Sequence, residues 1–177
     1  HPALRPEASD PAVDLRAHSF RSMAHDFIEI AAVTDAGSVR QFNEDSIATD
    51  SAVGVAVLAD GMGGHRAGEV ASQMATQVVM GSRQSQITEF RSDRAQHSPI
   101  RAVEQSINRA NRAVYDAARG QPMYHGMGTT LALSLFYDTH VALGHVGDSR
   151  LYRLRRDVLQ LLTRDDSLLQ DQVDLGF

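Results

Sequence analysis

The chain has 177 residues, of which 42% are hydrophobic and 22% are charged, and its formal net charge is -5. This composition is typical of a single globular domain, and the acidic balance argues against nucleic acid as a partner. No run approaches the roughly 18 apolar residues that a membrane span needs, so we also expect no membrane segment. The chain has no cysteine, which excludes disulfide scaffolds and thiolate chemistry, so any metal must be held by oxygen or imidazole.

The N-terminal segment differs from the rest, because Pro2, Pro6 and Pro11 occur there with little apolar periodicity. This composition predicts a flexible arm over residues 1–25 and one domain over residues 26–177. The arm begins with histidine and lacks the basic-then-apolar pattern of a secretory signal. We therefore expect a cytoplasmic protein.

Two strands are predicted at the start of the domain, residues 27–34 and the short run 47–49. Between them, residues 40–46 place an arginine, an asparagine and two adjacent carboxylates in one polar segment, RQFNEDS. On its own, such a cluster is most simply a solvated loop with a local ion pair.

An apolar run, residues 53–59, ends abruptly at Asp60 and is typical of a strand buried on both faces. The glycine-rich residues 61–64 allow a tight turn and a close approach to a ligand. An apolar stripe over residues 67–78 then begins a helix. This strand, loop and helix suit a phosphate loop, a metal loop or an ordinary turn.

The next segment, residues 81–97, is polar and predicts a long surface connection. A second helix is predicted from Ser98 to about Ala117, because a capping serine and a proline precede apolar residues spaced by three and four.

Four β-type runs follow, and the short turns between them favour antiparallel hairpins. They occupy residues 129–136, 140–146, 150–155 and 158–162. A short helix is predicted at 168–173. Because strands are grouped with strands and helices with helices, the sequence predicts an α+β fold with helices packed on antiparallel sheets.

Acidic residues mark the ends of two successive strands. Glu44 and Asp45 precede one strand and Asp60 ends the next, so adjacent strands would bring them together. Oxygen ligands without thiolates favour magnesium or manganese over zinc. Two such ions can lower the pKa of a water between them, and Arg40 fits beside them as a fork for phosphate oxygens.

Five motifs occur in order: GSVRQFNEDS at 37–46, ADGMGGHRAGEVAS at 59–72, GMGTT at 126–130, VGDSRLY at 146–152 and LTRDDS at 162–167. Together they make the chain resemble the metal-dependent, type 2C serine/threonine protein phosphatases in their bacterial form. The resemblance covers about residues 27–173. It implies a four-layer α-β-β-α sandwich of two antiparallel sheets flanked by helices.

The resemblance also implies a centre of two Mn²⁺ or Mg²⁺ ions at one edge of the sandwich. Asp60 would bridge the ions, Gly61 would offer its carbonyl oxygen, and Glu44 would join directly or through water. Asp148 is a candidate ligand of a third ion. An Asp-Ser pair that caps its own tight turn explains Asp148 equally well.

The implied activity is hydrolysis of phosphoserine or phosphothreonine in proteins by a metal-activated water, without a covalent intermediate. Arg40 would hold the substrate phosphate, and Asp45 would orient metal-bound water beside Asp60. The partners would be phosphorylated proteins, the targets of a serine/threonine kinase.

Three positions depart from the family pattern. Many eukaryotic members carry histidine where this chain has Met62, so a general acid is absent there and water or another residue must protonate the leaving group. His65 is most simply a surface residue of the loop. The last motif usually has histidine at Asp166, which we interpret as a structural substitution.

Members of this family normally continue with further strands, a helix and two more metal-binding aspartates, whereas the chain stops at Phe177. We therefore expect the C-terminal part of the sandwich to be missing and the second ion to be weakly held. Activity would be low or absent, and at least one of the carboxylates of Glu44, Asp45 and Asp60 would have a raised pKa without metal. Uncovered sheet edges, and apolar faces such as those of Val55, Val57, Leu131 and Leu133 left partly uncovered, would favour a dimer or an incompletely ordered piece of a longer protein.

Two alternatives compete with the phosphatase. The first is a pseudophosphatase or truncated regulatory module that binds phosphoproteins without turnover. The second is a hydrolase with Ser149 as nucleophile. No histidine follows Ser149, so its base would come from earlier in the chain, for example from His125.

Overall fold

The computed structural model describes residues 28–63, 66–92 and 98–166 of the chain. The predicted N-terminal arm at 1–25 and the predicted helix at 168–173 lie outside these residues. None of the helices in the described part is long and apolar enough to cross a membrane.

The centre of the fold is an antiparallel sheet with the strand order β1-β2-β4-β5, and a short strand, β3, pairs with the end of β2. These strands are β1 (Asp45–Asp50), β2 (Val55–Met62), β3 (Gly128–Thr129), β4 (Leu131–Tyr137) and β5 (His140–Val146). A separate hairpin pairs β6 (Tyr152–Arg155) with β7 (Val158–Leu161). The prediction of an α+β fold with antiparallel sheets is confirmed.

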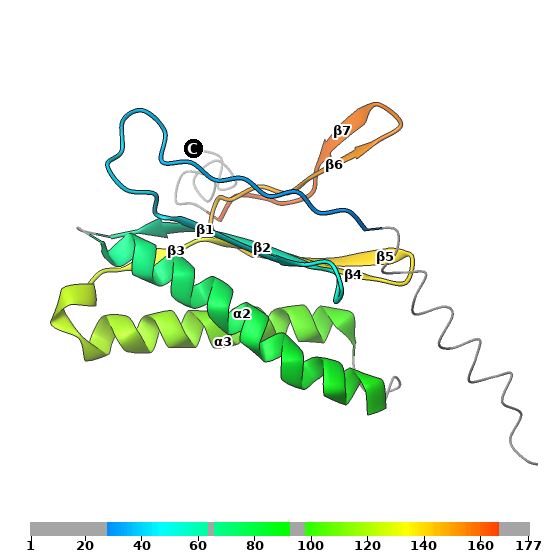
Figure 1. Cartoon of the computed structure of the whole chain (residues 1–177), viewed down its shortest axis with the longest axis horizontal. Coiled ribbons are helices and arrows are strands. Elements are labelled where there is room, and N and C mark those ends of the chain that lie inside the picture. Colours follow the sequence, from blue (N-terminus) through cyan, green and yellow to red (C-terminus); the bar gives the residue numbers. More distant parts are fainter. Residues whose placement is uncertain (1–27, 64–65, 93–97, 167–177) are drawn as a thin grey trace, which may run out of the picture.

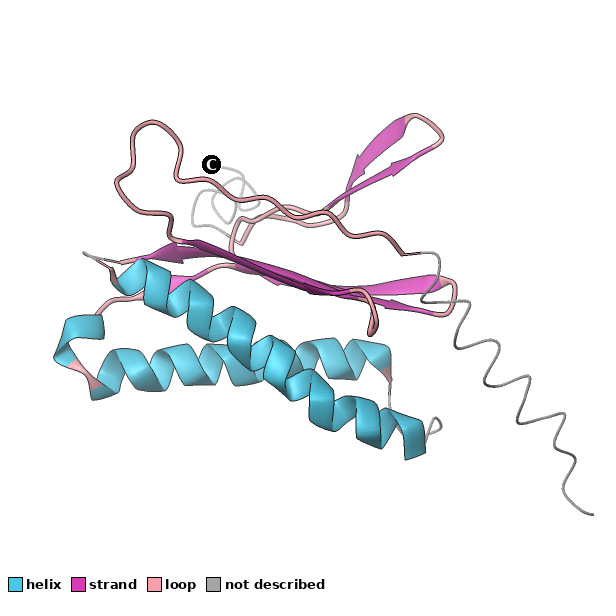
Figure 2. Ribbon diagram, in the orientation of Figure 1, coloured by secondary structure: helices cyan, strands magenta, loops and turns pink. Residues whose placement is uncertain are grey.

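Two long helices, α2 (Ala67–Ser92) and α3 (Pro99–Gly120), cover the same face of the main sheet, and the short η1 (Pro122–Tyr124) follows them (Figure 1). We call this face the inner face. The β6–β7 hairpin and the segment before β1 lie on the other side of the sheet, the outer face, as Figure 2 shows. The described residues thus supply a helix layer, the main sheet and a small second sheet.

The predicted surface connection at 81–97 is wrong over its first part, because α2 continues through Ser92. This stretch contains a single glycine and no proline, and glutamine, arginine and glutamate are good helix formers. A polar composition therefore did not end the helix. Helix α3 begins at Pro99 as predicted, although the Ser98 side chain makes no capping hydrogen bond.

The core lies between the inner face and the helices. Burial alternates along β2, and Val57 of β2 and Leu133 of β4 are both 2% exposed. The expectation that the apolar faces of Val55, Val57, Leu131 and Leu133 are partly uncovered is therefore wrong, because α2 and α3 cover them. Small residues such as Ala71, which is fully buried, let α2 approach the sheet closely. Burial of each Val or Leu side chain contributes about 1.5–3 kcal/mol relative to exposure.

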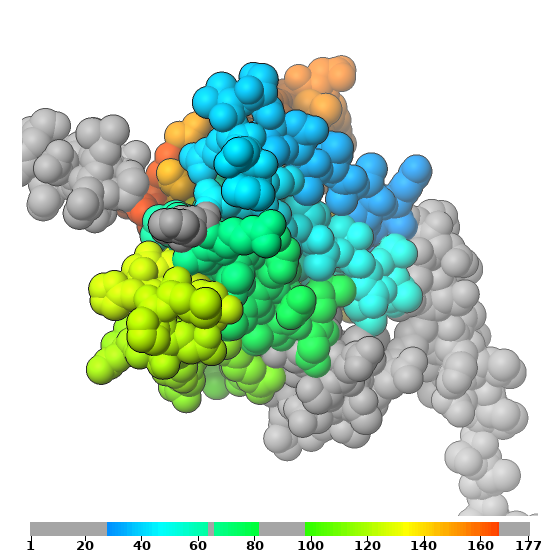
Figure 3. All heavy atoms as spheres, turned by 60° about the vertical axis from the view of Figure 1, so that its left-hand side comes forward, coloured from blue at the N-terminus to red at the C-terminus, as the bar shows by residue number. Residues whose placement is uncertain are grey.

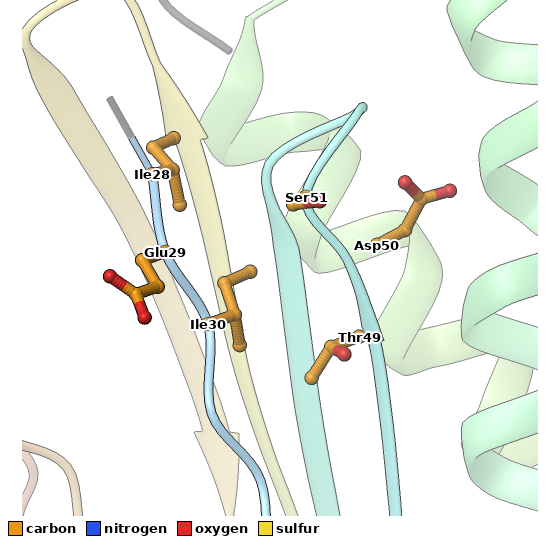
Figure 4. Close-up of a pocket in the computed structure, with 6 residues that line it drawn as sticks. All are labelled: Ile28, Glu29, Ile30, Thr49, Asp50 and Ser51. Atoms are coloured by element: carbon orange, nitrogen blue, oxygen red, sulfur yellow. The ribbon is translucent and has the colours of Figure 1, made fainter. Parts of the chain in front are cut away.

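The first predicted strand is wrong where the structure describes it, because residues 28–34 form no ladder with another strand. The segment still alternates: Ile28 and Ile30 are half-buried and Glu29 is exposed. It runs beside the end of β1 and forms one wall of an open pocket of about 440 Å³, lined by Ile28, Glu29, Ile30, Thr49, Asp50 and Ser51 (Figure 4). The sequence pattern predicted a strand but could not show whether a partner strand was available.

Candidate metal and phosphate site

The acidic residues meet at one end of the outer face. The register of β1 and β2 places Asp45 directly opposite Asp60, and the side chain of Asp45 raises the pKa of the Asp60 carboxyl. The prediction that adjacent strands bring these carboxylates together is therefore confirmed. Both residues lie within strands rather than in flanking loops, because β1 begins at Asp45 and β2 continues past Asp60 to Met62.

Charge and burial both act on Asp60. Burial raises the pKa of the Asp60 carboxyl most, and the negative charges of Asp45 and Asp148 raise this pKa further, while Arg40 lowers it. The expectation of a raised pKa is confirmed at this residue. The contributing neighbours include Asp148 rather than Glu44. A divalent cation bound here would relieve this repulsion.

Glu44 is held by groups other than the acidic pair. Its side chain is 14% exposed, and its Oε2 accepts a hydrogen bond of 2.8 Å from Nη1 of Arg40. Its Oε1 packs so closely against Gly68, in the first turn of α2, that a Cβ there would lie 2.6 Å away. The N-terminus of a helix favours negative charge. The roles predicted for Glu44 with the metal and for Arg40 with phosphate stay predictions.

Gly61 lets β2 pass the start of α2. A Cβ at Gly61 would collide with the Gly68 carbonyl oxygen and would lie 2.7 Å from the Glu44 carbonyl oxygen. The Gly61 amide donates to that Glu44 oxygen at 3.1 Å, and the Ser72 hydroxyl donates to it at 2.6 Å. The close approach that the glycine permits is to the helix backbone. Figure 3 shows this end of the molecule, where the loop before β1 (blue) lies above the start of α2 (green).

The loop after β5, the strand at the opposite edge of the sheet from β1, brings Asp148 close enough to Asp60 for its negative charge to raise the pKa of the Asp60 carboxyl. Its Gly147 carbonyl oxygen accepts from the Asp166 amide at 2.9 Å. Arg150 donates two hydrogen bonds, of 2.9 and 2.6 Å, to the carboxylate of Asp165. These bonds tie the Asp148 loop to the segment after β7. The Asp166 bond is made by its backbone amide, so the interpretation of Asp166 as a structural substitution stays a prediction.

Ser149 is bonded to a hydroxyl: its Oγ lies 2.7 Å from Oγ1 of Thr130. This pairing gives Ser149 a partner other than the imidazole base that the serine-nucleophile alternative requires. Sequence reasoning did not single out Thr130, which hydrogen-bonds both Asp60 and Ser149. A pair of threonines placed immediately before a strand was the available signal. Met62 is 65% exposed next to this end of the sheet, and His65 lies outside the described residues.

The donor set fits a hard divalent ion. The oxygens of Asp45 and Asp60 converge, and Asp148 lies near enough to act on Asp60 electrostatically. Within the described ranges, no three acidic or histidine side chains converge closely enough to enclose an ion by themselves. Mg²⁺ and Mn²⁺ commonly use one or two carboxylates and keep several waters, so the pair is sufficient for this class of site.

The chain matches the family Protein phosphatase 2C over residues 34–173, and it belongs to that family. It is 36% identical to the serine/threonine protein phosphatase PstP of Mycobacterium tuberculosis (strain CDC 1551 / Oshkosh), over 84% of this chain and 27% of that protein. It is 32% identical to the serine/threonine phosphatase stp of Listeria innocua, over 81% of this chain and 56% of that protein.

Solved structures agree with this assignment. The crystal structure of M. tuberculosis PstP/Ppp has a TM-score of 0.70 at 37% identity and covers 82% of this chain and 58% of that one. The catalytic domain of PstP in complex with two manganese ions has a TM-score of 0.68, also at 37% identity, and covers 82% and 59%. The chain therefore spans less than two thirds of each of these relatives.

Proposed function

We propose that the chain takes part in hydrolysis of phosphoserine or phosphothreonine in proteins, with two Mn²⁺ or Mg²⁺ ions as cofactors. The observation that carries this proposal is the Asp45–Asp60 pair on adjacent strands, with the Arg40 charge close enough to act on it. Family membership and the manganese complex of the PstP catalytic domain support it.

The acidic residues of the site would bind the ions and orient the attacking water. Asp60 and Asp45 would hold the ions with their carboxylates, together with the Gly61 carbonyl oxygen and, directly or through water, Glu44. Bound divalent ions supply Lewis acidity, which lowers the pKa of a water and polarises the phosphate. Asp45 would also orient the attacking water by accepting its proton in a hydrogen bond.

Arg40 would bind the phosphate oxygens. Its side chain is 70% exposed, and only Nη1 is used in the bond to Glu44, so other N–H groups of the fork remain for a phosphate. Attack of water forms a new P–O bond as the bond to the serine or threonine oxygen breaks. That oxygen then takes a proton from water or from another residue, because the thioether of Met62 cannot supply one.

Asp148 would add a third, weaker ion beside Asp60. This proposal is supported by the negative charge of Asp148, which raises the pKa of the Asp60 carboxyl, because a cation between the two carboxylates would relieve their repulsion. Removal of the Asp148 charge should therefore lower the number of Mn²⁺ ions bound without unfolding the sheet.

The substrates would be proteins phosphorylated by a serine/threonine kinase in the cytoplasm, which gives the chain a role in signal transduction. Apolar residues exposed on the outer face, Leu58, Phe136 and Val141, would pair with a second chain. Light scattering checks the dimer: a mass near 19.3 kDa at micromolar concentration would refute it.

Phosphate release from a phosphothreonine peptide tests the activity. We expect slow release that depends on Mn²⁺, stops with a chelator and resists a serine-directed covalent inhibitor. Peptide binding without any release would favour the pseudophosphatase, and release that persists with the chelator would contradict the metal-dependent mechanism.

A further inference from the structure

Thr130, the residue directly before β4, bonds to both backbone polar groups of Asp60. Its amide donates to the Asp60 carbonyl oxygen at 2.9 Å, and its Oγ1 accepts from the Asp60 amide at 3.0 Å. Two hydrogen bonds to one residue fix both the backbone and the side chain of Thr130 relative to the acidic pair.

The same side chain supports the loop that carries Asp148, on both sides of that residue. Thr130 Oγ1 lies 2.7 Å from Ser149 Oγ, and either hydroxyl can be the donor. The Thr130 methyl group packs against Gly147, where an added Cβ would lie 2.8 Å from Cγ2. Gly147 has a φ of 91°, a conformation that favours glycine. One side chain therefore touches both neighbours of Asp148.

We propose that Thr130 is a positioning residue that sets the separation between the carboxylates of Asp60 and Asp148. The inference rests on the proposed function, in which both carboxylates hold divalent ions. The two negative charges repel each other, so the Asp148 loop needs a restraint to stay close to β2. Thr130 supplies that restraint through its contacts with Ser149 and Gly147, which would not themselves contact an ion.

Threonine is the side chain that combines both contacts. Valine keeps the methyl group and the shape but loses the hydroxyl, whereas serine keeps the hydroxyl and loses the methyl group. Loss of an outer-shell partner typically costs about 10–100-fold in metal affinity. We expect Thr130→Val to weaken Mn²⁺ binding at Asp148 by about 10-fold or more, and Thr130→Ser to have a smaller effect.

Calorimetric or spin-resonance titration of the protein with Mn²⁺ tests this in a double-mutant cycle. Asp148→Asn should remove the binding step assigned to Asp148. Thr130→Val should weaken that step in the wild-type background and change nothing further in the Asp148→Asn background. The matched control is Thr139→Val, in the turn at the other end of β4 and β5, where the hydroxyl contacts His140; it should leave Mn²⁺ binding unchanged.

A second measurement needs no metal. Hydrogen exchange of the Asp60 amide should become faster in Thr130→Val and stay slow in Thr130→Ser, because only the first loses the acceptor. Ser149→Ala leaves the Thr130–Asp60 bonds in place, so the Asp60 amide should stay protected while Mn²⁺ binding weakens. This variant keeps the test decisive if Thr130→Val unfolds.

The outcomes distinguish a failure of the positioning role of Thr130 from a failure of the proposed function. Equal loss of Mn²⁺ affinity from Thr130→Val with and without Asp148, or full Mn²⁺ affinity in both Thr130→Val and Ser149→Ala, overturns the positioning role and leaves the proposed function intact. Absence of any Mn²⁺ binding by the wild-type protein overturns both.

Discussion

The two faces of the main sheet come from the same strands but have different properties. On the inner face, Val57 and Leu133 are almost fully buried against α2 and α3. On the outer face, Asp45 faces Asp60 while Leu58 is 36% exposed. Because successive side chains of a strand point to opposite faces, one face of this sheet packs against the helices and the other carries the acidic residues of the candidate site. Substitutions should therefore separate stability from activity according to the face they touch.

Asp60→Asn should have the largest effect on activity and the smallest cost in stability. An amide keeps the shape but loses the charge that the ions require, so we expect phosphate release to fall by about 100-fold or more. The fold should survive, because the variant removes a repulsion with Asp45. Turnover at limiting Mn²⁺ and urea unfolding measure the two quantities, and near-normal turnover would contradict the assignment.

Leu133→Ala should instead have a large cost in stability and a small effect on activity. It removes a side chain that is 2% exposed in the core, and such changes lower the free energy of unfolding by about 2–5 kcal/mol. The matched change on the other face, Leu58→Ala, should cost less than about 1 kcal/mol. Urea unfolding of both variants decides whether the faces differ, and equal losses would refute the division.

Arg40→Ala should act on the phosphate, because the guanidinium supplies hydrogen bonds to a charged group. Such bonds contribute about 1.5–3 kcal/mol, so we expect the inhibition constant of inorganic phosphate to rise about 10- to 100-fold. Mn²⁺ affinity should hardly change, and Arg40→Lys should recover part of the phosphate affinity. A large loss of Mn²⁺ binding with unchanged phosphate inhibition would assign Arg40 to the metal centre through Glu44 instead.

The smallest effect concerns the Arg150–Asp165 pair, which ties the Asp148 loop to the segment after β7. The hydrogen bonds from Arg150 lower the pKa of the Asp165 carboxyl. The pair therefore stabilises the fold fully above the unfolded pKa of about 3.9, and this contribution disappears as the pH falls through the lower folded pKa. Melting temperatures of wild type and Asp165→Asn should converge below about pH 4, and a constant difference would contradict this.

Sequence reasoning predicted the strands and helices better than it predicted which strands pair with each other. Alternation and turns predicted the strands of both sheets, and the placement of Asp45 and Asp60 near strand ends predicted their meeting. Residues 28–34 have a strand-like sequence but no partner strand, because pairing depends on which neighbours are available. Residues 81–92 stay helical because their good helix formers outweigh their polar character.

The details of the site were harder to predict because they depend on contacts between distant segments. Glu44 faces Arg40 and the start of α2, which the order of residues alone does not reveal. The two contacts of Thr130 join residues 60 and 149, which are far apart in the sequence. Strand pattern predicts which residues share an end of the sheet, but not which side chain holds another in place.

The contact between Gly61 and Gly68 has a consequence for the order of folding. These residues are close in sequence, so the loop between β2 and α2 closes at little entropic cost. The pairing of β2 with β4 must close a far longer loop, since Val55 meets Leu135. We therefore expect β1, β2 and α2 to assemble first, with Asp45 and Asp60 already adjacent, and Asp148 to join the other carboxylates only when β4 and β5 arrive.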